Sequence, residues 1–142
     1  RRMALPTKLV LEVVTPDRLV LREDVDEVVV PGSEGELGVL PGHTPLLATL
    51  KVGEMWYRTG SERHYLAVAM GFVEILPDRV TILAQVGERA QDIDVARAER
   101  AKQRAEGRIT TSAADIDLER ARIALMKSLI RLQVAAKVRM RS

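Results

Sequence analysis

The chain has 142 residues, of which 46% are hydrophobic, so its length and composition fit one globular domain or two small ones. It contains no cysteine and no apolar run of about 18 residues, which excludes disulfides, thiolate metal sites and membrane-inserted helices, and we expect a soluble intracellular protein. The net charge of +2 conceals an asymmetry, because residues 1–87 carry −3 and residues 88–142 carry +5.

Residues 1–87 contain all four aromatic residues and most of the glycines and prolines. Short runs rich in Val and Leu, bounded by Pro, Gly or Asp, are expected to be strands, the first three at residues 7–14, 18–22 and 27–30. Two pairs of runs are expected to form hairpins, 53–59 with 64–70 and 72–76 with 79–84. This spacing predicts a mainly β N-terminal domain of about ten strands, a sandwich or a flattened barrel.

Residues 31–53 are rich in glycine and proline, which favours tight turns between strands. The segment lacks the Lys-Ser/Thr ending of a phosphate-binding P-loop. His43 fits a hydrogen-bonded turn residue better than a metal ligand, since His64 is the only other histidine. The paired acids Asp24 and Asp26 are expected to be solvated in a turn. No catalytic constellation is found, so we expect neither an enzyme nor a metal site.

After Gly87 the only glycine is Gly107, and no proline follows Pro77, which permits long helices. We therefore expect a boundary at Gly87 and a helical hairpin in residues 88–142. Asp92 is expected to cap a first helix that starts at Ile93, and Gly107 is expected to end it.

A second helix is expected from Ala113 towards Val138, with Ser112 and Asp115 forming a capping box. Its apolar stripe contains Leu118, Ala121, Leu125, Leu129, Leu132 and Ala136. On the first helix, Ala98, Ala101 and Ala105 form a stripe of small residues that allows another helix to approach closely. A hairpin of this size is marginally stable alone, so two arrangements that differ by a few kcal/mol are expected, as in a switch.

Basic residues recur on both expected helices. Arg97 and Arg104 lie two turns apart on the first helix, and Lys127 and Arg131 lie one turn apart on the second. In a folded hairpin these four cations can converge on a triphosphate, although solvated helix charges would show the same spacing. From Arg120 onward there are seven basic residues and no acid, which favours an anionic partner over simple dipole compensation.

Two segments resemble the epsilon subunit of bacterial F-type ATP synthase. Residues 31–47, PGSEGELGVLPGHTPLL, match the family signature PGSEGELGxxPGHxPLL, and residues 93–98, IDVARA, match the I/L-D-x-x-R-A motif of epsilon subunits that bind ATP. The resemblance covers the chain from Met3 onward. It implies a ten-stranded sandwich that packs on the gamma subunit and contacts the c-ring loops, with Glu36 and His43 at that base.

The resemblance also implies a C-terminal hairpin that either folds onto the sandwich or extends beside gamma and blocks ATP hydrolysis by the catalytic alpha and beta subunits. Regulatory ATP would hold the hairpin down. The positions that match the family's ATP-binding residues are Glu88, Ile93, Asp94, Arg97, Ala98, Arg104, Lys127 and Arg131. Lys127 replaces the arginine of strong binders, which removes one bidentate phosphate contact.

The function that the resemblance implies is a non-catalytic rotor subunit, peripheral on the cytoplasmic face of the membrane, which couples ATP synthesis to proton or sodium transport. Arg120, Arg122, Lys127 and Arg131 would form the inhibitory surface, directed at an acidic loop of the beta subunits. One alternative is a stand-alone ATP-sensing module that binds another protein. A nucleic-acid binder is disfavoured, because residues 88–142 contain no aromatic residue for base stacking.

Overall fold

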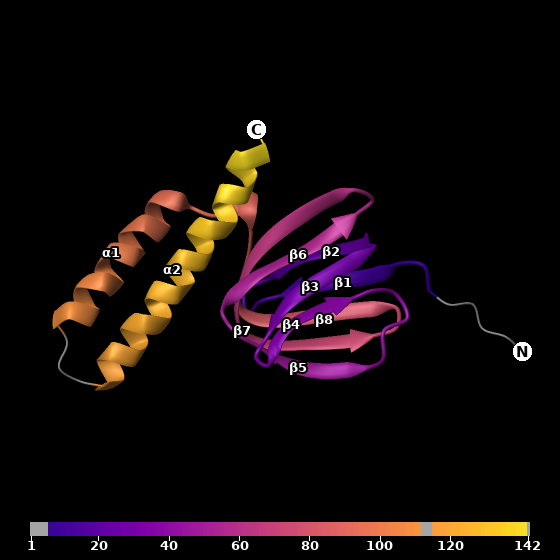
Figure 1. Ribbon diagram of the computed structural model, residues 1–142, viewed down its shortest axis with the longest axis horizontal. Helices are drawn as coiled ribbons and strands as arrows, with labels where there is room; N and C mark the ends of the chain where they lie inside the picture. Colours follow the sequence, from indigo (N-terminus) through magenta and orange to yellow (C-terminus); the bar gives the residue numbers. More distant parts are fainter. Residues whose placement is uncertain (1–5, 112–114, 142) are drawn as a thin grey trace, which may run out of the picture. The chain divides into compact units, whose positions relative to one another are not determined.

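The computed structural model describes residues 6–111 and 115–141, without the side chains of residues 116 and 139–141. The chain divides into two compact units, which we call the sandwich unit (Arg1–Arg89) and the hairpin unit (Ala90–Ser142). Figure 1 shows strands in the first and helices in the second. The predicted fold class, a β-sandwich followed by a helical hairpin, is confirmed.

Eight strands form the described part of the sandwich unit. They are β1 (Leu9–Val14), β2 (Leu19–Val25), β3 (Glu27–Gly32), β4 (Gly35–Val39), β5 (Leu46–Leu50), β6 (Gly53–Thr59), β7 (Glu62–Leu76) and β8 (Arg79–Arg89). The strand order is β2-β1-β8-β7-β5-β3-β4, and β6 pairs with both β3 and β7. All pairings are antiparallel except that of β1 with β8.

Both predicted hairpins form, but β7 joins two runs that were expected to be separate strands, and the described strands number eight rather than about ten. β7 pairs with β6 up to Val68 and with β5 from Gly71 onward, while β8 stays beside it throughout. At the change of partner, Met70 has a φ of 54°, the only positive φ of a described non-glycine residue. The strand therefore bends from one neighbour to the next without ending.

The core of the sandwich unit follows from alternation along the strands. In β1, buried and half-buried residues alternate, and Leu9, Leu11 and Val13 are fully buried. The largest fully buried side chains are Leu9, Leu11, Met55, Leu66, Ile75 and Ile82, together with several valines. Each such side chain contributes roughly 1.5–3 kcal/mol by leaving water, so this cluster dominates the stability of the unit.

The end of the sandwich unit lies slightly beyond the expected boundary. Gly87 is inside β8, where it faces Val68 of β7, and the strand continues to Arg89. A Cβ at Gly87 would lie 3.2 Å from a methyl group of Val13, so this glycine allows close packing rather than marking a break.

The hairpin unit begins with a short 3-10 helix, η1 (Ala90–Asp92), followed by α1 (Val95–Thr111) and α2 (Asp115–Arg141). The prediction that Asp92 caps the first helix was wrong, because Asp94 caps it instead. Oδ1 of Asp94, not the carboxylate of Asp92, accepts the backbone N–H of Arg97 at 3.0 Å. Asp92 is part of η1, so the side chain that satisfies a free amide of the first α-helical turn is that of Asp94.

The prediction that Gly107 ends the first helix was also wrong, because α1 continues to Thr111. Gly107 lacks the positive φ of a helix-ending glycine. The hydroxyls of Thr110 and Thr111 donate to the carbonyl oxygen of Gly107 at 2.9 and 2.8 Å. The proposed capping box at Ser112 and the helix start at Ala113 lie outside the described residues.

The two helices pack together through small side chains. Ala98 and Ala105 of α1 are 3% and 2% exposed, as the predicted stripe of small residues requires. The predicted leucine stripe of α2 is only partly right, because Leu129 is 45% exposed. The buried residues with a seven-residue repeat are Ala121, Ser128 and Ala135. The hydroxyl of Ser128 donates to the carbonyl oxygen of Ala124 at 2.9 Å, which satisfies it inside the contact.

Candidate functional site

Glu36 and His43 both lie in the sandwich unit, in the region of β4 and the following loop. Glu36 is exposed and lines a cleft of about 520 Å³ between residues 32–37 and 46–49. Leu47, 69% exposed, lines the same cleft. Apolar and acidic groups therefore share one exposed surface.

His43 is not among the residues that line this cleft. Its Nδ1 is 2.6 Å from the carbonyl oxygen of Thr44, and its backbone N–H bonds to the carbonyl of Leu40 at 3.2 Å. The preceding Gly42, with a φ of 89°, donates its N–H to Pro77 at 2.7 Å. The histidine is thus held in a turn that is tied to the β7–β8 hairpin.

Seven of the eight expected ATP-binding positions belong to the hairpin unit. They are Ile93, Asp94, Arg97, Ala98, Arg104, Lys127 and Arg131. Glu88 belongs to β8 of the sandwich unit, where it is half-buried opposite Ala67. The hairpin unit alone therefore supplies the four cations and the acidic cap.

These seven side chains divide into buried and accessible ones. Ile93 and Ala98 are 8% and 3% exposed, so they shape the packing around the start of α1. Arg97 and Arg104 are exposed on α1, and Lys127 is half-buried on α2. Within the described part of the chain, no ion pair involves these three cations.

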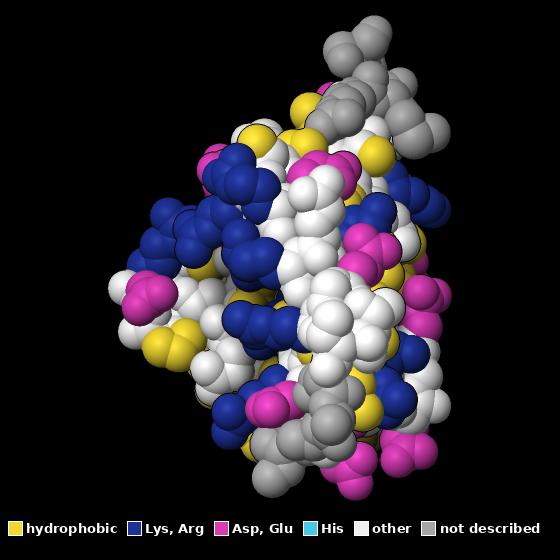
Figure 2. Space-filling view, turned by 90° about the vertical axis from the view of Figure 1, so that its left-hand side faces the viewer, with side chains coloured by type: hydrophobic (Ala, Val, Ile, Leu, Met, Phe, Trp, Pro, Cys, Tyr) yellow, Lys and Arg dark blue, Asp and Glu magenta, His cyan; other side chains and the backbone are white. Residues whose placement is uncertain are grey.

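The electrostatic character of the hairpin unit is strongly positive on one side. Figure 2 shows Lys and Arg side chains gathered along part of this face, with few acidic groups between them. Arg120 and Arg122 are exposed on α2, whereas Lys127 and Arg131 are half-buried. The side chains of Arg139 and Arg141, the last of the seven predicted cations, lie outside the described residues.

The start of α1 also carries a group that can recognise a neutral donor. Oδ1 of Asp94 is used by the Arg97 amide, and among the described hydrogen bonds its second oxygen has no donor. A carboxylate oxygen at this position can accept a hydrogen bond from a hydroxyl or amino group of a ligand. The carboxylate of Asp94 and the cations of the two helices together suit a ligand that carries both hydrogen-bond donors and phosphate groups.

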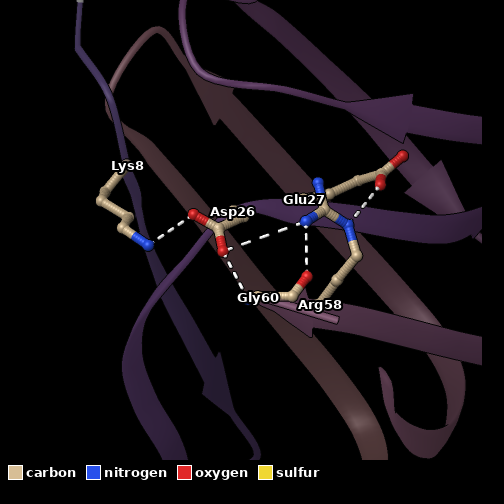
Figure 3. A network of polar contacts seen from close by, with 5 residues as sticks. All are labelled: Lys8, Asp26, Glu27, Arg58 and Gly60. Carbon is tan, nitrogen blue, oxygen red and sulfur yellow. Dashed lines mark hydrogen bonds and ion pairs between the residues drawn. The ribbon is translucent and has the colours of Figure 1, made fainter. Parts of the chain in front are cut away.

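A polar network in the sandwich unit was missed, and it corrects the expectation that Asp26 is solvated (Figure 3). The carboxylate of Asp26 accepts hydrogen bonds from Lys8 Nζ and, at 2.7 Å, from the backbone N–H of Gly60. Arg58 donates Nε to Glu27 at 3.1 Å and an N–H to the carbonyl of Gly60 at 2.8 Å. The bonds from Lys8 and Gly60 lower the pKa of Asp26 below its usual value of 3.8.

Two further classes of site find no support among the described residues. No group of three or more His, Cys, Asp and Glu side chains there could hold a metal ion. No helix in the same set is long and apolar enough to cross a membrane.

Both units match known families along their length. The family described as ATP synthase, Delta/Epsilon chain, beta-sandwich domain matches residues 8–90. The family described as ATP synthase, Delta/Epsilon chain, long alpha-helix domain matches residues 91–136. The two matches are contiguous and meet at the junction between the sandwich and hairpin units.

Curated relatives and solved structures agree with these matches. The ATP synthase epsilon chain of Syntrophobacter fumaroxidans is 50% identical over 92% of this chain and 97% of its own length. The ATP synthase epsilon chain of Desulforamulus reducens is 46% identical, over 88% of this chain and 95% of its own length. A chain in the Euglena gracilis mitochondrial ATP synthase structure shares the fold, with a TM-score of 0.79, 23% identity, and coverage of 94% of this chain and 84% of its own. The chain therefore belongs to the delta/epsilon chain family of ATP synthase, with both of the family's domains in their usual order.

Proposed function

We propose that this chain is the non-catalytic epsilon subunit of an F-type ATP synthase, part of the central stalk that couples ATP synthesis to ion transport. The observation that carries this proposal is the match of both domains, in order, to one family, with relatives about 50% identical along almost their full length. In this role the protein is peripheral to the membrane, on its cytoplasmic face.

The sandwich unit is the rotor-binding part in this proposal. The cleft beside Glu36 offers an acidic group next to the exposed Leu46 and Leu47, a combination that suits a surface with both basic and apolar groups. Contact with the gamma subunit and the c-ring loops through Glu36 and His43 is the role we assign to this end of the sandwich.

The hairpin unit is the regulatory part. Arg97 and Arg104 on α1 and Lys127 and Arg131 on α2 stand on two helices that pack against each other. Four cations on packed helices support binding of a triphosphate, and Asp94 supplies an acceptor for a sugar hydroxyl or a base amino group. ATP binds only the closed hairpin in this proposal, because separation of the helices would disperse the cations.

Inhibition of hydrolysis would use α2 in its extended arrangement. Arg120 and Arg122 are exposed, and the helix carries no acid from Arg120 onward, so it suits an acidic surface such as a loop on the catalytic beta subunits. ATP shifts the equilibrium only by its differential affinity for the two arrangements. A hundredfold excess over its Kd would contribute about 2.7 kcal/mol, comparable to the gap of a bistable hairpin.

The central-stalk role is tested by co-expression with the gamma subunit of the same complex. The full chain should co-purify with gamma, and Glu36→Ala with His43→Ala should weaken the coupling of the assembled rotor to the c-ring. A chain that binds ATP but never co-purifies with gamma would favour the alternative, a stand-alone ATP-sensing module.

The inhibitory role is tested with the assembled catalytic head and a variant in which Arg120, Arg122, Lys127 and Arg131 are all alanine. Inhibition by the parent chain should weaken as salt rises, because charge pairs at a protein rim are screened over about 8 Å at physiological ionic strength. The alanine variant should inhibit weakly at low salt. Strong inhibition by that variant would assign the block to apolar packing of α2.

A further inference from the structure

Tyr57, Glu23 and Arg89 form a cluster at the end of the sandwich unit that the proposed rotor contact and ATP site do not use. The side chain of Tyr57 interacts with the carboxylate of Glu23, and a terminal nitrogen of Arg89 lies 3.9 Å from Oε1 of the same carboxylate. Tyr57 is only 4% exposed, and its ring stacks on His64 with centroids 4.9 Å apart. Burial, with the neighbouring charge of Glu23, raises the pKa of Tyr57 to about 12.

The cluster joins three strands that do not pair directly with one another. Glu23 lies on β2, Tyr57 on β6 and Arg89 on β8. Among the described pairings, β2 pairs only with β1, β6 pairs with β3 and β7, and β8 pairs with β1 and β7. These side chains therefore close a side of the sandwich that the hydrogen-bond ladder leaves open.

The side chain of Arg89 is 32% exposed. Its Nε is buried without a hydrogen-bond partner among the described residues, although its terminal nitrogen reaches Glu23. The backbone of Arg89 forms the last β8 pair, with Leu66 of β7.

Arg89 places the cluster next to the junction between the sandwich and hairpin units. It is the last residue of the sandwich unit, and the hairpin unit begins at Ala90. Between β8 and α1 lie only residues 90–94, of which residues 90–92 form η1. We propose that Tyr57, Glu23 and Arg89 anchor the end of β8, so that any rearrangement of the hairpin unit is confined to residues 90–94.

The anchor itself rests on the geometry of the sandwich unit, and its regulatory use rests on the proposed function. With the anchor intact, β8 stays paired up to Arg89 while the hairpin unit moves. Without it, the last pairs of β8 open and the hinge lengthens into the strand. The anchor is thus a positioning device, and none of its three residues is assigned to ligand binding.

The experiment measures hydrogen exchange of single amides by NMR in the full chain without ATP, so a chain that never bound ATP would still give a readable result. Glu23→Gln retains an acceptor for Tyr57 but removes the charge, and Arg89→Met retains the apolar stem. Both should speed exchange of amides in residues 86–89 by up to about fivefold, the loss expected of a partly exposed ion pair. Amides of residues 10–14 should be unchanged.

The matched control is a second Arg–Glu pair on the same strand. Arg79, at the start of β8, has a terminal nitrogen 3.9 Å from Glu12 but no buried tyrosine partner and an exposed side chain. Arg79→Met should leave residues 86–89 unchanged. Equal acceleration in Arg79→Met and Arg89→Met, acceleration spread over the whole sheet, or no acceleration in either anchor variant would each overturn the proposal.

Discussion

The sandwich and hairpin units differ in what they bury. The sandwich unit buries large side chains such as Leu11, Leu66 and Ile82, whereas the residues buried in the hairpin unit are mostly small, such as Ala98, Ala121 and Ser128. A fully buried Leu or Ile gains roughly 1.5–3 kcal/mol, but a single methyl group gains about 0.8. The difference indicates that burial of apolar side chains stabilises the sandwich unit more than the hairpin unit.

The largest effect is expected where the sandwich is most tightly packed. A Cβ at Gly71 would lie 1.9 Å from the backbone oxygen of Leu83, which cannot move without breaking the β7–β8 ladder. Gly71→Ala should destabilise the sandwich by about 3 kcal/mol or more. Urea unfolding followed by Trp56 fluorescence measures this unit, because Trp56 is the only tryptophan and lies in β6.

The control is Gly38→Ala in β4, where no atom lies within 4 Å of the added Cβ. It should change the midpoint little. If Gly71→Ala and Gly38→Ala lowered the urea midpoint by similar amounts, the tight packing of β7 against β8 at Gly71 would be contradicted.

Substitution of exposed cations in the hairpin unit should change ATP binding rather than the stability of the protein. Arg97 is exposed, and its side chain makes no described ion pair, so Arg97→Ala should leave the unfolding midpoint nearly unchanged. It should weaken ATP binding by roughly 1.5–3 kcal/mol, the range for hydrogen bonds to charged groups. Calorimetry with Arg100→Ala, an exposed cation of the same helix outside the proposed site, is the control; equal affinities in all three proteins would remove Arg97 from the site.

A substitution at Lys127 that tightens ATP binding would also support the proposed ATP site. Lys127→Arg should tighten ATP binding, because a guanidinium can contact a phosphate with two parallel N–H donors where an ammonium acts as a point charge. The change should be smaller than the loss in Arg97→Ala, since the charge is already present. Looser binding of ATP to the arginine variant would show that Lys127 does not face the phosphates.

Acid should affect the sandwich through Asp26. Its pKa is lowered in the folded state by hydrogen bonds from Lys8 and Gly60, so the carboxylate stabilises the fold at neutral pH, and this contribution is lost as the pH falls through the lowered value. Asp26→Asn should lower the urea midpoint at pH 7, and the difference from the parent should vanish at low pH. A difference that is constant down to pH 2 would contradict this role.

The smallest effect should be a gain in the hairpin. Gly107 lies inside α1, has no positive φ, and has no atom within 4 Å of an added Cβ. Gly107→Ala should therefore stabilise the helix by about 0.5–1 kcal/mol. Far-UV circular dichroism during thermal unfolding would detect the shift, while the fluorescence of Trp56 should not move; a loss of helicity would show that the glycine is required.

The sequence predicts the sandwich better than the hairpin, for a physical reason. Turns in the sandwich are marked by residues such as Pro77-Asp78, whose backbone preferences are local. β7 continues through Met70, which has a positive φ and lies where the strand changes its partner from β6 to β5, and these partners are not evident from the local sequence. The bond between Lys8 and Asp26 joins residues that are distant in sequence, so no spacing rule could have found it.

The helices were misjudged where the chain offers two equivalent choices. Asp92 and Asp94 are both good caps, and the turn at η1 decides between them. Gly107 is a good helix end, yet α1 continues beyond it to Thr111. Around α2 apolar residues occur on several faces, so the buried side is set by packing against α1. The basic residues of the proposed ATP site could be named from the sequence. Whether they share one surface depends on how α1 and α2 pack together.

The most direct test of the regulatory hairpin is calorimetric titration of the full chain with ATP and, separately, with ADP. ATP should bind one site per chain and more tightly than ADP, because the third phosphate adds charge for the cations of α1 and α2. Binding should weaken at high salt. The absence of saturable heat with ATP, or equal affinity for ATP and ADP, would contradict the account.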